Sequence, residues 1–285
     1  MERTETFQIG DFCFQIRYPK EITPPPNFML FRKEGAAPEY EYEIQIRSDF
    51  PKAAGRQTAM RPDLAVFTDG NREMRFIGVK GTEGYYACYE ETTDRSARIY
   101  LDPARLGGLN IDPVFSSLLA LERRLILRDS LILHCAYVEY KGKAILFSAP
   151  SETGKTTQAN LWEKYRGSRT VNGDRGLLTR KGNEWIVQGW PVCGTSEICE
   201  NKTMPVRSIV MLEQAKEDHA RLLAKGEAFS LLYRQITINR WNTQAHMYAM
   251  DLIEDVLSHI PVYQLGCTIS RHAVDCLDDA MHLSC

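Results

Sequence analysis

Residues 144–157 read Ala-Ile-Leu-Phe-Ser-Ala-Pro-Ser-Glu-Thr-Gly-Lys-Thr-Thr and carry the strongest fold signal in this chain of 285 residues. The apolar start predicts a buried strand, and Gly-Lys-Thr at 154–156 opens a segment with helical spacing. A strand, a tight loop and a helix in succession are the setting in which a GxxxxGK(S/T) pattern predicts a phosphate-binding loop. In such a loop, backbone N–H groups and the positive end of the helix dipole face the phosphate oxygens.

The loop predicts a site for ATP with Mg²⁺. Lys155 is expected to reach the terminal phosphates, and the Thr156 hydroxyl is expected to be a Mg²⁺ ligand. Ala149 replaces the first glycine of the pattern and Pro150 follows it, so we expect an entry turn with negative φ. The alternative is a solvated turn that holds Gly-Lys-Thr by chance. The residues predicted to contact the nucleotide are Ser151, Glu152, Thr153, Gly154, Lys155, Thr156 and Thr157.

Strands and helices alternate from Leu131 onward, which is typical of an α/β domain. Residues 109–129 carry apolar side chains at helical spacing after the Gly107-Gly108 break, so we predict one connecting helix there. The second domain is predicted at 109–285. Further strands are predicted at 131–138, 143–148, 185–187, 206–212 and 262–265, and helices at 155–165, at 243–259 and from Ser270.

The first part of the chain shows period-two alternation instead. Phe12, Phe14, Ile16 and Tyr18 fall on one face of a predicted strand, and 40–46 repeats the pattern. Further strands are predicted at 75–79, 85–89 and 97–101. We therefore expect a small antiparallel β domain at 1–108.

Composition excludes some classes of function. Lys and Arg total 35 and Asp and Glu total 37, so no strong field favours nucleic acid or an acidic membrane. No apolar run is long enough for a signal peptide core or a membrane helix. The eight cysteines form no CxxC pair and no zinc spacing. These features predict a cytoplasmic protein with reduced thiols.

Beside these motifs, residues from about 131 to 277 resemble the catalytic domain of the HPr kinase/phosphorylase family, which shares the phosphoenolpyruvate carboxykinase type of P-loop fold. The resemblance rests on Leu133-His134-Cys135-Ala136, on the loop, and on Thr170-Val-Asn-Gly-Asp-Arg175. Residues 189–194 and 200–202 are similar to small members of the family. The fold expected is α/β (α+β), an N-terminal β domain followed by a kinase domain.

The resemblance implies the catalytic residues. The acidic pair of the family falls on Gly173 and Asp174, so Asp174 alone is expected to act as base and as Mg²⁺ ligand with Thr156. His134 is expected to face the transferring phosphate and to orient that base or stabilise charge. The catalytic set is therefore Lys155, Asp174 and His134. The alternatives are a turn aspartate at 174 and a core histidine at 134 bonded to a backbone carbonyl.

The resulting prediction is a kinase that transfers phosphate from ATP to a serine hydroxyl, on a small carrier protein, a modified peptide or the free amino acid. Lys202, Arg207, Arg234 and Arg240 are candidates for a cation at the developing charge. The family's hexamers imply a homo-oligomer. A sensor or pseudokinase that binds ATP without turnover is the second hypothesis, because Gly173 replaces an acid. Carboxykinase chemistry is the third, and the chain shows no ligands for its second metal.

Overall fold

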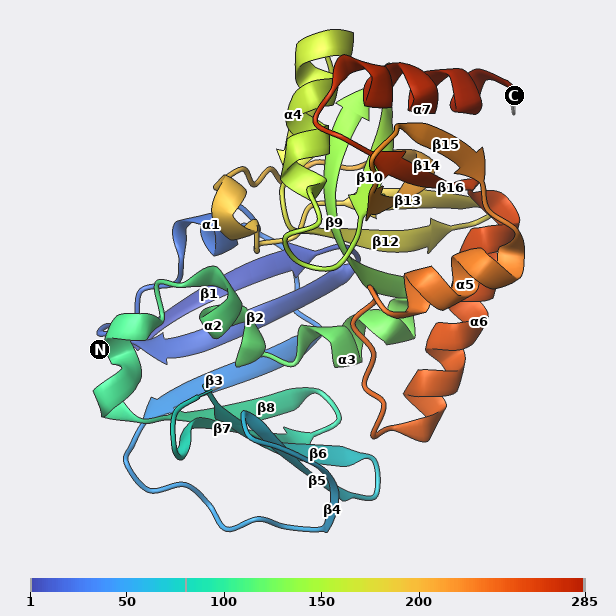
Figure 1. The fold of residues 1–285 in the computed structure, drawn as a ribbon. Helices are drawn as coiled ribbons and strands as arrows, with labels where there is room; N and C mark the ends of the chain where they lie inside the picture. Colours follow the sequence, from blue (N-terminus) through green and yellow to red (C-terminus); the bar gives the residue numbers. More distant parts are fainter. Residues whose placement is uncertain (1, 80, 284–285) are drawn as a thin grey trace. The chain divides into compact units, whose positions relative to one another are not determined.

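The computed structural model describes residues 2–79 and 81–283 and has a mixed α/β fold with two large sheets and few helices (Figure 1). The chain divides into two compact units, Met1–Arg124 with Arg240–Thr243, and Leu125–Asn239 with Gln244–Cys285. Residues 109–124, which we expected in the second domain, thus belong to the first unit.

The first unit is built on an eight-stranded sheet with the order β1-β2-β3-β8-β7-β6-β5-β4. Its elements are β1 (Glu2–Ile9), β2 (Phe12–Pro19), α1 (Pro26–Met29), β3 (Tyr40–Ile46), β4 (Arg56–Arg61), β5 (Leu64–Asp69), β6 (Arg72–Gly78), β7 (Tyr85–Thr93), β8 (Ser96–Leu101), η1 (Pro103–Gly108), α2 (Asp112–Ser117) and most of α3 (Leu121–Leu125). The period-two prediction is confirmed, since Phe12, Phe14, Ile16 and Tyr18 are all buried.

The predicted antiparallel pairing is confirmed for most of this sheet but was wrong for β3. Strand β3 runs parallel to both β2 and β8. Parallel neighbours need a crossover connection rather than a hairpin, and the segment with α1 provides it between β2 and β3. The sequence pattern of each strand identifies its faces but not the direction of its neighbours.

The predicted connecting helix at 109–129 was also wrong, because it is three shorter pieces, α2, α3 and η2 (Ile126–Arg128). Ala120 has a φ of 47°, in the left-handed region that a continuous helix excludes. The chain therefore turns between α2 and α3.

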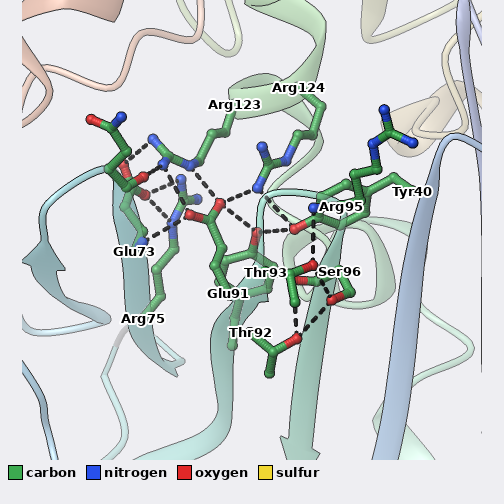
Figure 2. Close-up of polar contacts among 12 residues, drawn as sticks. Tyr40, Glu73, Arg75, Glu91, Thr92, Thr93, Arg95, Ser96, Arg123 and Arg124 are labelled. Carbon is green, nitrogen blue, oxygen red and sulfur yellow. Dashed lines mark hydrogen bonds and ion pairs between the residues drawn. The ribbon is translucent and has the colours of Figure 1, made fainter.

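A buried group of charged side chains ties α3 to the sheet of the first unit (Figure 2). Arg123 donates to Glu91 at 2.6 Å and to Glu73 at 2.8 Å, and Arg124 also donates to Glu91. Arg75 pairs with Glu73 at 2.8 Å. These five side chains are at most 13% exposed. Because each charge meets an opposite one, the group is a structural clamp rather than an open binding site.

Replacing Glu91 by glutamine is expected to lower the free energy of unfolding by about 3–5 kcal/mol, because the buried guanidinium groups of Arg123 and Arg124 lose their contact with the Glu91 carboxylate. Urea unfolding measures the change, with Glu41→Gln on the exposed side of β3 as the matched control. Equal stability of the two variants would contradict the assignment of this clamp.

The same carboxylate predicts how stability depends on pH. Burial alone would raise the pKa of Glu91, but Arg123 and Arg124 outweigh it and lower that pKa from its ordinary 4.5. The contribution of Glu91 is therefore complete above about pH 4.5 and is lost as the pH falls through the lowered folded-state value. Glu91→Gln should remove this part of the acid dependence.

The second unit holds the predicted loop. Its elements are η2, β9 (Ser130–Tyr140), β10 (Lys143–Ser148), α4 (Lys155–Arg166), β11 (Arg169–Asn172), β12 (Arg175–Lys181), β13 (Glu184–Gln188), η3 (Gly194–Ser196), β14 (Met204–Gln214), β15 (His219–Leu222), α5 (Lys225–Tyr233), α6 (Thr243–His259), β16 (Val262–Cys267) and α7 (Arg271–Leu283). Strands β10, β14 and β16 are parallel neighbours, and the others pair antiparallel. In parallel sheets, ligands bind beyond the carboxyl ends of such strands.

The parallel strands carry a core on each face. Ile209 and Met211 of β14 pack with α5 and α6, whereas Val210 and Leu212 pack with α4 and α7. Figure 1 shows these helix pairs on separate sides of the strands. Two covered faces explain the continuous apolar run of β10. None of the helices in the described residues has the length and apolar character of a membrane span.

Candidate functional site

The loop between β10 and α4 has the predicted variant entry. Ala149 keeps a negative φ, and its methyl group is buried in the core beneath α4 and α7. The turn is completed further along, where Gly154 has a φ of 113° and Glu152 a φ of 64°. The first of these values is accessible to glycine and strained for other residues. The glycine of Gly-Lys-Thr is therefore required by the backbone.

The loop leaves a continuous row of backbone donors without partners. Residues 151–152 form a turn, but within the described chain no N–H group from Ser151 to Thr157 donates a hydrogen bond of normal geometry. The first such donor in the helix is Gln158, to the Gly154 carbonyl at 2.9 Å. The Thr156 hydroxyl also has no partner among the described residues. Polar backbone groups that are left unpaired at a helix start are ready to bind an anion. These residues therefore fit phosphate oxygens.

The Lys155 side chain folds back across the start of the loop. Its ammonium donates to the carbonyls of Ala149 and Pro150 at 3.2 and 3.3 Å. Burial lowers the pKa of Lys155, and the negative charge of Asp174 opposes that shift. The Lys155 cation is thus partly desolvated and lies near the negative charge of Asp174.

His134 and Asp174 form the second part of the site. His134 Nε2 lies 3.4 Å from Asp174 Oδ1, and its Nδ1 lies 3.2 Å from Gln235 Oε1. A backbone hydrogen bond next to both residues keeps them together: the Cys135 N–H donates to the Asp174 carbonyl at 2.9 Å. The imidazole contacts side chains on both sides rather than a backbone carbonyl. Its ring is thus held in one orientation beside the carboxylate.

Asp174 is held as a carboxylate. Burial alone would raise its pKa, but the hydrogen bond from His134 and the charge of Arg175 outweigh burial and lower it. Arg175 Nε donates to Asp174 Oδ2 at 3.1 Å. A carboxylate with a lowered pKa is a weak base, so it can orient a donor or attract a cation, and it takes up a proton only from a group that has become strongly acidic.

The turn that presents Asp174 depends on Asn172, which our sequence reasoning did not single out. Its side-chain Oδ1 accepts from the Asp174 and Arg175 N–H groups, both at 2.9 Å, and its Nδ2 donates to the Trp190 carbonyl at 2.9 Å. The signal for this role was in the sequence, because asparagine before glycine favours a side chain that bonds to the backbone two residues on.

Ser196 occupies the space that the side chain of a second acid at position 173 would need. A Cβ atom on Gly173 would lie 1.9 Å from Ser196 Oγ and 2.3 Å from Ser196 Cβ. The same turn approaches Asp174, since a Cβ on Gly194 would lie 3.1 Å from the Asp174 Cβ. The η3 turn therefore packs against the backbone at 173 and leaves no room for a carboxylate there.

Gly173→Ala is accordingly expected to destabilise the protein by about 1–3 kcal/mol through overpacking. Ser196→Gly removes both contacted atoms, so the double variant Gly173→Ala/Ser196→Gly should recover most of the loss. Denaturant unfolding of the wild type, the single alanine variant and the double variant measures the free energy of unfolding of each. Wild-type stability of the single alanine variant would show that the turn is not packed as described.

A cavity of about 200 Å³ lies beyond the carboxyl ends of the parallel strands. Its walls come from the loop start at Ala149 and Pro150, from β14 and β16, and from the end of α5 with Arg234 and Gln235. Arg234 is one of the four cationic residues that the sequence offered as candidates, and it lines this cavity. Two others are engaged elsewhere, Lys202 with Glu139 and Arg207 with the Tyr140 ring.

No cluster of three or more His, Cys, Asp or Glu side chains suited to a metal occurs in the described part of the chain. This pattern is compatible with Mg²⁺, which keeps several waters and binds through one or two protein oxygens and the substrate phosphates. Thr156 and Asp174 remain the protein ligands that the residues of the site offer.

A family model and a solved structure each match a part of this chain. A model of the family described as SynChlorMet cassette protein ScmC matches residues 108–281. No curated protein matches the sequence. Among solved structures, that of the Hpr(Ser) kinase/phosphatase from Coxiella burnetii aligns with 11% identity and a TM-score of 0.32, over 54% of this chain and 89% of the other. The likeness to that enzyme is distant.

Proposed function

We propose that this chain, which belongs to the family of SynChlorMet cassette protein ScmC, binds ATP with Mg²⁺ and transfers its terminal phosphoryl group to a hydroxyl. The observation that carries this proposal is the row of unpartnered N–H groups from Ser151 to Thr157 at the start of α4. Their number and position match the oxygens of a polyphosphate better than those of a single carboxylate. The acceptor we propose is a serine hydroxyl, on a peptide, on a small protein or in the free amino acid.

Each residue of the site has a part in such a transfer. The loop amides hold the phosphates, and Lys155 exchanges its two loop carbonyls for phosphate oxygens. Thr156 and Asp174 are the residues that would hold Mg²⁺, which would neutralise the charge that develops on the phosphates. Catalysis of this kind is mainly positioning and electrostatic stabilisation.

The bond changes balance with the residues present. The acceptor oxygen forms a bond to the terminal phosphorus, the bond from that phosphorus to its bridging oxygen breaks, and ADP leaves. Asp174, ionised and oriented by His134, accepts a hydrogen bond from the acceptor hydroxyl and receives its proton late in the reaction. A lowered pKa suits this role because transfer through a loose transition state needs little early proton removal.

The experiment is transfer of label from [γ-³²P]ATP, with Mg²⁺, to a panel that holds L-serine, serine-containing peptides and a small carrier protein. The expected result is a labelled phosphomonoester that is absent without Mg²⁺. If calorimetry detects no binding of ATP at all, the proposal is wrong.

One observation favours a second candidate, a sensor that binds ATP without turnover. Ser196 occupies the space beside Gly173, so the site has one acid where the kinase family it resembles has a pair. A single carboxylate has to serve both the metal and the acceptor. Tight ATP binding with no labelled product on any member of the panel would support the sensor.

A further inference from the structure

The cavity beyond the parallel strands carries two opposite charges that do not neutralise each other. Arg234 and Glu213 both line it. Among the described residues, the side chain of Arg234 forms no ion pair or hydrogen bond. Glu213 accepts a hydrogen bond from the amide of Gln264, and Arg221 lies near enough for its charge to interact with that of Glu213. The two side chains that line the cavity, Arg234 and Glu213, form no ion pair with each other, so the cavity offers a positive and a negative group to a ligand.

The cavity adjoins the chemistry of the proposed transfer. Ala149 and Pro150 form part of its wall, and the carbonyls of the same two residues accept from the Lys155 ammonium. Gln235 lines it as well and contacts His134, which in turn contacts Asp174. A ligand in this cavity would thus lie next to the two carbonyls that hold Lys155, with Gln235 between it and His134.

Size and lining restrict the ligand. A volume of about 200 Å³ is below the roughly 300–1,000 Å³ of pockets for drug-sized molecules. Met211, Leu212 and Leu231 supply apolar wall between the charged groups. A folded carrier protein could offer at most one side chain to such a space, and that side chain would leave both charges without a partner.

We propose that this cavity binds the acceptor as a free hydroxy amino acid, an inference that rests on the proposed phosphoryl transfer. Arg234 takes the α-carboxylate through its forked donors, and Glu213 takes the α-ammonium. The side-chain hydroxyl is directed to Gln235 and His134, where its oxygen attacks the terminal phosphorus, its proton passes to Asp174 and ADP leaves. The product is the phosphomonoester of the amino acid.

Binding without nucleotide tests the assignment. The probes are L-serine, L-serine methyl ester, which lacks the carboxylate, and N-acetyl-L-serine, which lacks the ammonium. Ligand-observed NMR should show that the wild type binds L-serine about ten- to a hundredfold more tightly than either analogue. Arg234→Gln should remove the preference over the methyl ester, and Glu213→Gln the preference over the N-acetyl compound.

The controls make the same charge changes outside the cavity. Lys225→Gln lies at the other end of α5 and Glu217→Gln beyond the end of β14, and both should keep the preferences of the wild type. Equal binding of all three probes, or no binding of L-serine to a protein that binds Mg·ATP, would overturn the inference and leave the proposed transfer standing. Displacement of L-serine by adenosine would also overturn it, because the cavity would then be the base site. Failure to bind Mg·ATP would contradict the proposed function, and the titration with L-serine and its analogues would still show whether the cavity binds an amino acid.

Discussion

Replacing Lys155 by alanine is expected to weaken binding of Mg·ATP by about ten- to a hundredfold and to lower the rate of phosphoryl transfer by about 10²–10³-fold. The first effect follows from the loss of charge-assisted hydrogen bonds, which contribute about 1.5–3 kcal/mol each. The second follows from the loss of a fixed positive charge at the transferring group. Calorimetry and initial rates with labelled ATP measure the two effects separately.

The control for this variant is Lys164→Ala, which removes the same charge from the last turn of α4. It should match the wild type in both measurements. Lys155 is buried and bonds to two loop carbonyls, so Lys155→Ala also needs a check of stability by thermal unfolding. If a folded Lys155→Ala protein keeps the wild-type affinity for Mg·ATP and the wild-type rate, the Lys155 ammonium takes no part in nucleotide binding or transfer.

Asp174→Asn is expected to lower the transfer rate by about 10²–10⁴-fold while the dissociation constant of ATP changes little. The amide keeps the shape of the carboxylate but cannot accept the proton or balance the charges of His134 and Arg175. The proton acceptor acts only in the transition state, whereas an Asp174 contact with Mg²⁺ also exists in the ground state. The fall in kcat is therefore expected to be much larger than the change in ATP affinity.

Asp279→Asn, at an exposed position on α7, serves as the matched control. The pH profile adds a second readout, since the lowered pKa of Asp174 places its protonation below the ordinary 3.8 of aspartate. The wild-type rate should therefore show no acid limb from this carboxylate near neutral pH. If Asp174→Asn transfers phosphate at the wild-type rate, the acceptor is not activated at this residue.

Local patterns predicted the part of the fold that holds the loop. The strand at 143–148, the helix from Lys155 and the helix at 243–259 were all predicted within a residue of their observed ends. Each depends on neighbours along the chain, namely an apolar run, a glycine that adopts a positive φ and a repeat at helical spacing. Such signals are readable in one sequence because the interactions that produce them are local.

Contacts between distant segments were not predictable in the same way. The parallel pairing of β3 depends on a crossover, and the helix break at Ala120 falls on a residue type with high helix propensity. Within the site, the sequence indicated His134 and Asp174 but neither Gln235 nor Ser196, which come from segments far along the chain. Nothing in the local sequence of Ser196 shows that it fills the space beside Gly173.

Hydrogen–deuterium exchange of the loop amides tests the central claim most directly. The N–H groups from Ser151 to Thr157 have no acceptors within the described chain, so they should exchange fast in the free protein. Saturating Mg·ATP should slow their exchange in the wild type, and adenosine without phosphates should not. If exchange across 151–157 is unchanged by Mg·ATP at concentrations up to the millimolar range, the loop does not hold a polyphosphate and the proposed function is wrong.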